Sequence, residues 1–416
     1  MMSFLDDEQG RIIHFDPVSG RALVLPLPAT DVGRAEDLLR EDVSPWIPWS
    51  APGAMPPQQQ FLEARRSSDL VVGVLGAETC NFACRYCYEQ HRPRLMTEET
   101  AARVLAFVRA RLGEASRLHF GWFGGESLLN AGLVASLTRE VREACERAGT
   151  HFVCGISTNG YLLVPEIAEQ LREAGLQRLQ ITLDGLAQQH DERRPLGDGS
   201  PSFARIWENL LYLRSMAEPF AKVTIRCNVD HDNVQSVFAL IRHLVETFGD
   251  CSNTFEIYAR PVGDPGNGRA GPCFGTAEWR AMQAQFSAAA YTLAKESLPS
   301  PRPVYCEANL RNSFLIGANG EVYKCSHRMG DEDVIGHLER DGELVLNQRS
   351  EQWMVNYFDD RACMECSFLP LCQGGCPLQR LQGGKTCAWT EDSVRAQCIV
   401  ASRMLLPEMD GPAIIG

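Results

Sequence analysis

Apolar and polar positions change period regularly between residues 70 and 260 of the chain. Six short apolar runs have the length of buried strands and lie at 70–75, 117–123, 152–157, 176–183, 222–229 and 255–260. Apolar residues recur at helical spacing between these runs, over 97–112, 133–148, 165–174, 203–215 and 234–248. Thr97, ahead of Glu98 and Glu99, is a suitable N-cap for the first of these helices.

This alternation predicts βαβ units and hence a parallel sheet covered by helices. Six units are too few to close an eight-stranded barrel. We therefore predict an α/β fold, a partial (β/α)6 TIM-like barrel, over residues 61–270. A connecting helix is expected over 271–305, before a cysteine-rich C-terminal domain over 306–416.

The first 60 residues have a different pattern. Apolar segments at 11–15 and 21–25 flank the turn sequence Asp16-Pro17-Val18-Ser19-Gly20, which favours a hairpin. A short helix is expected over 31–40, and the proline-rich stretch 44–60 indicates a linker. Residues 1–60 are thus predicted to form a small N-terminal module and its linker.

Composition and charge narrow the class of protein. The chain has 416 residues, 44% of them apolar and 22% charged, as in soluble globular proteins. Its net charge of −13 argues against a nucleic-acid partner. Apolar runs fall short of the roughly 18 residues of a membrane span, and the acidic start MMSFLDDEQG lacks an export signal. We expect no membrane association and a cytoplasmic location.

Cysteine is over-represented, with 16 residues in the chain. Without export these are not expected to form disulfides, which makes metal or cluster ligation the leading interpretation. Three lie together at Cys80, Cys84 and Cys87, directly after the first predicted strand. Another eight lie between residues 306 and 398.

Residues suited to binding also end the following strands. They are Gly124, Gly125 and Glu126 after the second strand, Ser157, Thr158 and Asn159 at the third, Thr182 and Asp184 at the fourth, and Arg226 and Asn228 late in the fifth. In barrel-type α/β folds the carboxyl ends of parallel strands form the active site. Five consecutive strands therefore direct their polar residues to one mouth.

The cysteine loop places three thiolates within eight residues, and soft thiolates suit zinc or iron–sulfur clusters. A structural zinc site normally has four ligands, and only His91 lies at a natural spacing for the fourth. Three cysteines on a [4Fe-4S] cube leave one iron open. A zinc site or a non-catalytic metal-binding scaffold remains an alternative.

This CxxxCxxC loop, followed by the aromatic Tyr88, resembles that of the radical S-adenosylmethionine (SAM) superfamily. The resemblance implies that the open iron binds the methionine part of SAM and that reductive cleavage releases a 5′-deoxyadenosyl radical. It also implies that Gly124, Gly125 and Glu126 receive the methionine ammonium, and that Ser157, Thr158, Asn159 and Thr182 hold the ribose and carboxylate. Arg226 and Asn228 are further candidates for SAM contacts.

The C-terminal cysteines resemble the SPASM extension of radical SAM enzymes that modify peptides. The pattern runs from Cys306 through Gly320 and Cys325 to Cys363-x2-Cys366-x5-Cys372-x3-Cys376, with Cys387 and Cys398 after it. The resemblance implies two auxiliary [4Fe-4S] clusters, three in all. Cys306, Cys325 and Cys376 would hold auxiliary cluster I, and Cys363, Cys366 and Cys372 auxiliary cluster II. Cys387 and Cys398 would be divided between the two, unless one is merely packed.

The function implied is oxidative crosslinking of a ribosomally made precursor peptide, through a thioether, C–C or C–O bond, with a reductant such as flavodoxin or ferredoxin. The N-terminal module resembles a leader-recognition region, though a stabilising cap is an equal alternative. Related anaerobic sulfatase maturases make formylglycine with an Asp after the second SPASM cysteine, where this chain has Ser326. Candidates for a catalytic base are Asp184, Asp264, Glu307 and His327.

Overall fold

The computed structural model describes residues 2–6, 8–26, 56–263, 272–290, 293–294, 298–385, 387, 389–406 and 413–415. The chain divides into two compact units. The sheet unit comprises Ser67–Gly275 and Leu310–Met354, and the terminal unit comprises Met1–Arg66, Thr276–Asn309 and Val355–Gly416. Among the described helices, none combines the length and apolar character that a membrane span requires.

The sheet unit is built on a ten-stranded sheet in which six successive strands, ending at one edge with β9, are parallel and follow chain order. These strands are β4 (Leu70–Ala77), β5 (Arg117–Gly124), β6 (His151–Thr158), β7 (Arg178–Thr182), β8 (Lys222–Val229) and β9 (Phe255–Pro261). All six predicted strands are confirmed. The alternation of these strands with helices gives the α/β fold that the sequence predicts.

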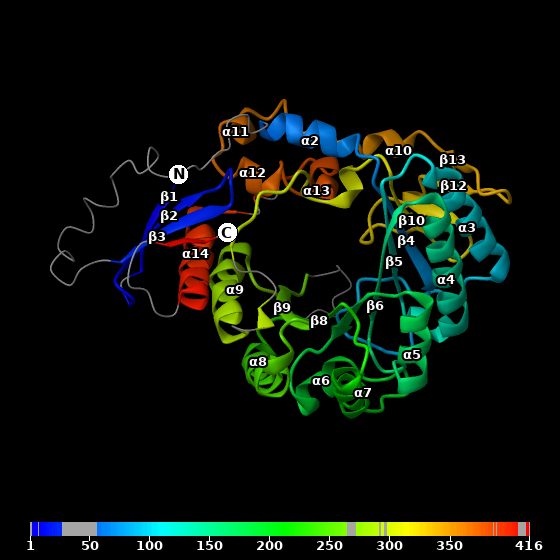
Figure 1. The fold of residues 1–416 in the computed structure, drawn as a ribbon, viewed down its shortest axis with the longest axis horizontal. Coiled ribbons are helices and arrows are strands. Elements are labelled where there is room, and N and C mark those ends of the chain that lie inside the picture. The colour runs from blue at the N-terminus through cyan, green and yellow to red at the C-terminus, as the bar shows by residue number, and fades with distance from the viewer. Residues whose placement is uncertain are drawn as a thin grey trace. The chain divides into compact units, whose positions relative to one another are not determined.

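The helices between these strands cover one face of the sheet, and in Figure 1 they lie outside the row of strands. They are α3 (Glu98–Leu112), α4 (Ala131–Ala148), α5 (Pro165–Ala174), α6 (Ala187–Arg193), α7 (Phe203–Ser215) and α8 (Val234–Phe248), with the short η3 (Ser127–Asn130) and η4 (Gly249–Cys251). The predicted cap is present, since Thr97 accepts a hydrogen bond from the backbone N–H of Thr100 at 3.2 Å.

The two faces of the sheet have opposite character because side chains alternate along a strand. Leu179 and Ile181 of β7 are buried on the face toward the helices, as are Ile225 of β8 and Ile257 of β9. The neighbouring Gln180 is half-buried on the other face. This inner face also carries Ser157, Thr182, Arg226 and Tyr258, so the fold presents a polar wall to any ligand in the barrel.

A second set of strands extends the sheet beyond β4. Strand β10 (Ser313–Ile316) pairs with β4 in parallel, and β11 (Glu321–Tyr323), β12 (Gly336–Leu338) and β13 (Leu344–Leu346) continue it antiparallel. The short η7 (Asp331–Asp333) and α10 (Arg349–Gln352) lie in the same segment. Residues 310–354, expected with the C-terminal domain, are therefore part of the sheet unit because their strands pair with it.

The terminal unit contains a four-stranded antiparallel sheet of order β1-β2-β3-β14. Its strands are β1 (Met2–Asp6), β2 (Arg11–Asp16), β3 (Arg21–Pro26) and β14 (Ala413–Ile415). The predicted hairpin is the β2–β3 pair. Helix α14 (Glu391–Leu405) shares an apolar core with this sheet, in which Phe15, Val24 and Val394 are fully buried.

The other elements of this unit are α2 (Pro57–Arg65), α9 (Thr276–Ala290), η6 (Glu307–Asn309), α11 (Arg361–Met364), α12 (Leu369–Cys372) and α13 (Pro377–Leu381). Residues 57–60, expected in the linker, begin α2, because Pro57 at the first helical position needs no partner for a backbone N–H. The helix expected over 31–40 and residues 44–55 of the expected linker lie outside the described residues.

Candidate active site at the cysteine loop

The three cysteines of the first motif lie in one loop that leaves the carboxyl end of β4. Cys80, Cys84 and Cys87 are all partly exposed. Burial raises the pKa of Cys80 to about 12 and that of Cys87 to about 11, and it also raises the pKa of Cys84. The thiols are therefore protonated at neutral pH until a positively charged partner stabilises their thiolates.

His91 lies beside this loop, with its Nε2 atom 3.6 Å from Sγ of Cys87. Within the described ranges, no three Cys, His, Asp or Glu side chains are grouped so that they could hold a single metal ion. Glu89 has its pKa raised to about 7 by burial, with a further contribution from Glu126.

The glycine pair at the end of β5 lets the loop that follows contact the cysteine loop closely. Gly124 has a φ of +103°, in the region that favours glycine. A Cβ atom on Gly125 would lie only 2.2 Å from the carbonyl oxygen of Thr79. The backbone N–H of Glu126 donates to the same carbonyl at 2.9 Å. Only glycine at position 125 permits this contact.

Glu126 is completely buried, and both of its carboxylate oxygens accept hydrogen bonds. Oε1 accepts from the backbone N–H of Leu128 at 3.0 Å and from the Thr158 hydroxyl at 2.8 Å. Oε2 accepts from the backbone N–H of Asn159 at 2.7 Å. The carboxylate expected to receive an ammonium therefore ties the end of β5 to the end of β6.

Asn159 continues this connection to the cysteine loop. Its Nδ2 atom donates to Oδ1 of Asn81 at 2.8 Å and lies 3.9 Å from Sγ of Cys80. Ser157, by contrast, points to the inner face, where its hydroxyl accepts from Nε2 of Gln180 at 3.1 Å. Oε1 of Gln180 in turn accepts from the Tyr258 hydroxyl at 2.6 Å. Ser157 is thus positioned by neighbouring strands.

Tyr86, within the cysteine loop, joins three other elements through its hydroxyl. The hydroxyl donates to Oδ2 of Asp184, and it accepts from Nη1 of Arg194 at 2.6 Å and from Nδ2 of Asn228 at 3.1 Å. Asp184 is fully buried, and its Oδ1 accepts from the backbone N–H of Asn228 at 2.8 Å. Asp184, a candidate base, therefore anchors the loop, with each of its carboxylate oxygens accepting a hydrogen bond.

The segment from Arg193 to Gly197 holds the cysteine loop from the side, which the sequence reasoning missed. The backbone N–H of Ala83 donates to the Pro195 carbonyl, and that of Gly197 donates to the Asn81 carbonyl, both at 2.9 Å. Arg193 is fixed by a fully buried ion pair with Asp230 at 2.8 Å. The basic pair Arg193-Arg194 before a proline was the available signal.

Arg194 supplies positive charge at the cysteine loop. It is largely buried, and its charge lowers the pKa of all three loop cysteines against the larger opposing effect of burial. A buried cation beside three thiols fits a group that carries net negative charge when thiolates bind it. The donor set and its charge therefore suit a thiolate-bound cluster.

His327 lies against the aromatic residue of the cysteine motif. Its ring stacks on Tyr88, with centroids 4.4 Å apart and planes inclined by 25°. Burial lowers the pKa of His327, and the nearby Arg226 lowers it further. Arg226 also donates from Nε to Oδ1 of Asn228 at 2.8 Å. Thr182 pairs with Arg226 across β7 and β8.

The other base candidates are elsewhere. Glu307 belongs to the terminal unit, in η6, where burial raises its pKa. Asp264 lies outside the described residues. Of the four candidates, the structure brings Asp184 and His327 to residues of the cysteine loop.

In the terminal unit the C-terminal cysteines form two groups of neighbours. Burial raises the pKa of Cys372, and nearby Cys366, Cys363 and Cys387 raise it further. Burial likewise raises the pKa of Cys306, to which Cys376 adds. Cys325 belongs to the sheet unit, after β11, so its place in the second group stays a prediction.

Cys398 differs from these cysteines. Its side chain is fully buried in the apolar core formed by α14 and the β1–β3 sheet, among residues such as Phe15 and Val394. A thiol in such a place behaves as a small apolar side chain. Cys387, which is exposed, is the terminal cysteine that lies with Cys372.

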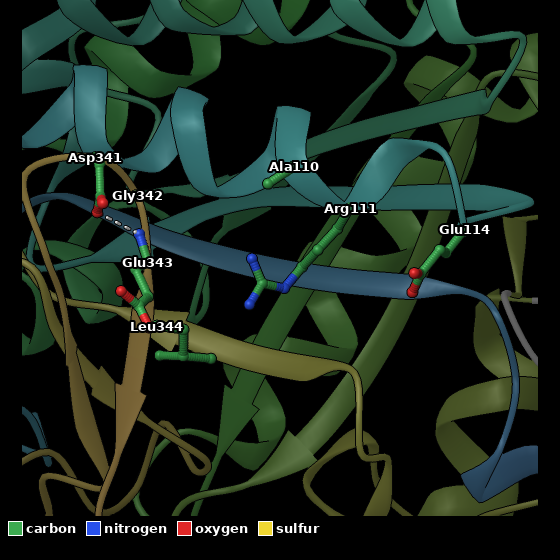
Figure 2. A pocket seen from close by; sticks show the side chains of 7 residues that line it. All are labelled: Ala110, Arg111, Glu114, Asp341, Gly342, Glu343 and Leu344. Atoms are coloured by element: carbon green, nitrogen blue, oxygen red, sulfur yellow. Dashed lines mark hydrogen bonds between the residues drawn. The ribbon is translucent and has the colours of Figure 1, made fainter.

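Figure 2 shows a pocket between the end of α3 and the turn that joins β12 to β13. Arg111 lies along it, with its guanidinium 4.0 Å from the Phe107 ring. The turn packs tightly, since a Cβ on Gly342 would lie 2.4 Å from the Phe107 nitrogen. Helix α3 runs from the side of the cysteine loop toward the start of β5. The pocket at its C-terminal end therefore lies near the amino ends of the parallel strands, away from the cysteine loop.

Comparison with protein-family models finds a match over residues 74–243 to the radical SAM superfamily. The chain is 23% identical over 348 residues to a serine-type anaerobic sulfatase-maturating enzyme of Bacteroides thetaiotaomicron, covering 75% of this chain and 83% of that protein. It is 24% identical over 321 residues to an enzyme of the same name from Klebsiella aerogenes, covering 72% and 77% respectively.

Two solved structures share the fold. One is anSMEcpe with bound AdoMet and Cp18Cys peptide, with a TM-score of 0.56, 16% identity and coverage of 82% of this chain and 97% of that one. The other is Streptococcus suis SuiB bound to precursor peptide SuiA, with a TM-score of 0.51, 12% identity and coverage of 90% and 95%. At these identities the likeness concerns the fold.

Proposed function

Because the chain contains a radical SAM domain and a cysteine-rich C-terminal region of the SPASM type, we propose that it is a maturase that oxidatively crosslinks a precursor peptide. The observation that carries the proposal is the cysteine loop. Three thiols lie at the carboxyl end of β4, joined by hydrogen bonds to the ends of β5, β6, β7 and β8. This is the edge of a parallel sheet where active sites form.

Membership of the superfamily implies one [4Fe-4S] cluster and SAM. The loop fits such a cluster through its three thiols and the buried charge of Arg194. When bound, the cluster and SAM supply a 5′-deoxyadenosyl radical for hydrogen abstraction. In this proposal Cys80, Cys84 and Cys87 ligate iron and leave one corner open.

The remaining residues of the site divide into ligands and supports. Ser157, Thr182, Arg226 and Asn228 have side chains at the polar inner face and are proposed to contact SAM. Glu126, Thr158 and Asn159 are proposed to act mainly by fixing the loops, because their polar atoms already bond one another. Gly124 and Gly125 bring the backbone of the β5 loop close to the site.

Two auxiliary clusters in the C-terminal region are part of the proposal. Cys363, Cys366, Cys372 and Cys387 are proposed as one complete set of four thiolates, since the other three lie near Cys372. Cys306 and Cys376 are proposed ligands of the other cluster, and the inclusion of Cys325 rests on the family resemblance. A cytoplasmic setting with a reductant such as flavodoxin or ferredoxin completes the proposal.

A peptide substrate is supported by the relatives, whose names or titles describe sulfatase maturation and a bound precursor peptide. Formylglycine formation is the second candidate, favoured by the names of the sequence relatives. Ser326 argues against this function. Sulfatase maturases have an aspartate at this position, and a hydroxyl is a far weaker base than that carboxylate. His327 beside Tyr88 is the base we propose for this site.

Mass spectrometry distinguishes these functions. The chain is co-expressed with the short peptide encoded beside it, and separately incubated with SAM, a reductant and a synthetic peptide carrying a sulfatase-type Ser or Cys. Crosslinking predicts that the first peptide loses two hydrogen atoms and that tandem fragmentation fails between two linked residues. An aldehyde on the synthetic peptide, trapped by a hydrazide, would instead support formylglycine formation. The absence of both products would contradict the maturase proposal.

A further inference from the structure

Gln373, directly after Cys372, has an unusual backbone. Its φ is +44°, and within the described ranges it is the one residue other than glycine with a positive φ. A Cβ atom makes this left-handed conformation unfavourable, so it persists where the surrounding structure requires that side chain. Glycines occupy the next two positions, 374 and 375, also with positive φ. The chain therefore keeps a glutamine where glycine would fit with less strain.

The Gln373 side chain is buried, with 1% of its surface exposed. Its Oε1 atom accepts a hydrogen bond from the Tyr357 hydroxyl at 2.7 Å. Its Nε2 atom is buried and has no hydrogen-bond partner among the described residues. A buried N–H group without an acceptor is costly, and native proteins rarely leave one in this state. An acceptor for Nε2 is therefore expected in the complete protein.

The surroundings of this amide point to that acceptor. The Tyr357 phenol lies near Cys372 and Cys363, since both thiols add to the rise of its pKa that burial causes. The Tyr357 ring also packs within 2.5 Å of where a Cβ on Gly374 would be, so the loop after Cys372 is held against it. The amide, which directly follows Cys372 and is bonded to Tyr357, is thus held close to Cys372 and Cys363.

A second donor reaches the same group of thiols. Nη2 of Arg380 lies 3.0 Å from Sγ of Cys363, and its Nη1 lies 3.5 Å from Oδ2 of Asp360. Lys385 contacts the same Asp360 oxygen at 3.0 Å. Arg380 is therefore held in place by Asp360 while one of its N–H groups points at sulfur. Two independent features, one neutral and one charged, present donors to these cysteines.

We propose that Nε2 of Gln373 and the guanidinium of Arg380 donate hydrogen bonds to sulfur atoms of the cluster held by Cys363, Cys366, Cys372 and Cys387, and raise its reduction potential. Thiolates and sulfides are acceptors, and the reduced cluster carries one more negative charge than the oxidised one. Hydrogen bonds and positive charge at the sulfurs therefore favour the reduced state. The inference rests on the proposed auxiliary cluster and adds the groups that set its potential.

Gln373→Gly and Gln373→Glu test this inference. Glycine removes the amide and relieves the left-handed backbone, so this variant is expected to fold. Glutamate keeps the side-chain length and the acceptor for Tyr357 but replaces the donor by a second oxygen. Gln379→Glu is the matched control. Gln379 is exposed on the nearby α13, and its replacement by glutamate adds the same charge.

The measurement is a redox titration followed by electron paramagnetic resonance on anaerobically reconstituted protein. All samples carry the three substitutions Cys80→Ala, Cys84→Ala and Cys87→Ala, so that the signals come from the C-terminal region. We expect Gln373→Gly to lower one midpoint potential by the equivalent of roughly tenfold in the reduction equilibrium, ~59 mV for one electron. Gln373→Glu lowers it further, and Gln379→Glu leaves it near the parent value.

Equal midpoint potentials in the parent and both Gln373 variants, with iron content unchanged, would overturn the inference. Failure of the parent to bind C-terminal iron would instead contradict the auxiliary cluster itself, so iron analysis separates the two. Arg380→Met provides the second arm: it is expected to lower the same midpoint potential, and a shift in a different signal would contradict the assignment.

Discussion

The two cysteine-bearing regions are supported in different ways. Around the cysteine loop, the polar side chains bond mainly to one another: Glu126 to Thr158 and Asn159, and Tyr86 to Asp184 and Arg194. In the C-terminal region, Arg380 approaches a thiol at 3.0 Å, and Gln373 keeps an unused donor. In the first region the Phe82 N–H and the Asn159 amide lie 3.4 and 3.9 Å from the Cys80 sulfur, whereas in the second the donor to sulfur is charged and closer.

This difference suits different tasks. A loop whose supports are satisfied internally can hold three thiolates while leaving room for a ligand at the fourth position. A thiol approached by a charged donor suits a group that stays in place and exchanges electrons.

The largest effect is expected from Cys372→Ala compared with Cys398→Ala. Cys372 has three cysteine neighbours, so its loss is expected to remove about four irons per chain, the content of one cube. Cys398 is packed in the apolar core, so its loss is expected to leave iron unchanged and to lower the unfolding free energy by about 1 kcal/mol. Iron and sulfide analysis with urea denaturation checks both. Iron loss in Cys398→Ala would contradict this assignment.

Gly125→Ala is expected to have the next largest effect. The added methyl group would collide with the Thr79 carbonyl, so the β5 loop must move away from the cysteine loop. We expect a loss of about 3 kcal/mol in the unfolding free energy. Gly121→Ala in strand β5, just before this loop, is the control, because a Cβ there meets nothing within 4 Å. Equal stability of the two variants would show that the close contact is unnecessary.

Tyr86→Phe removes only the hydroxyl that joins the cysteine loop to Asp184, Arg194 and Asn228. Because buried groups lose their partner, a fall of about 2 kcal/mol in the unfolding free energy is expected, with slower SAM cleavage. Tyr212→Phe, which removes a hydroxyl bonded to Glu169 on the surface, should change neither. Chemical denaturation and quantification of 5′-deoxyadenosine measure the two effects. Equal stability and equal SAM cleavage in Tyr86→Phe and Tyr212→Phe would contradict the supporting role of the Tyr86 hydroxyl.

The smallest effect concerns His190, whose pKa is held well below its usual value by burial, with the charges of Arg194 and Arg193 adding to this. The unfolded chain then binds more protons than the folded one, so stability falls as pH decreases below about 6.5, by about 1.4 kcal/mol per unit. His190→Asn retains an acceptor for the Asp184 N–H and should flatten this dependence. Urea unfolding between pH 7.5 and 5.5 checks it, and identical slopes would contradict it.

Local patterns predicted the sheet unit well because each strand and helix there has its own period and caps. The six parallel strands and Thr97 follow from residues close in the chain. Strands β10 and β14 were not predicted from local patterns. Strand β10 is stabilised by pairing with β4, far away in sequence, and β14 has only three residues. The same reason explains why residues 310–354 were expected with the C-terminal domain, whereas in the structure they group with the sheet unit.

The sequence predicted which residues gather at the site better than it predicted the role of each residue there. The residues at the strand ends do gather near the cysteine loop, as for Asn159 beside Asn81 and Asp184 beside Tyr86. That both carboxylate oxygens of Glu126 and of Asp184 accept hydrogen bonds depends on donors distant in the chain, which spacing does not reveal. Likewise, burial separates Cys398 from Cys387, although both fit the spacing.

SAM cleavage by wild-type protein and by Cys84→Ala tests the central claim most directly, namely that the cysteine loop holds a cluster with one open corner. Both proteins are purified anaerobically, reduced and incubated with SAM, and 5′-deoxyadenosine is quantified beside iron. The account predicts that wild type releases 5′-deoxyadenosine with about twelve irons per chain, four per cube, and that Cys84→Ala releases none while keeping its C-terminal iron. Release by Cys84→Ala at the wild-type rate, or its absence from iron-loaded wild type, would contradict the account.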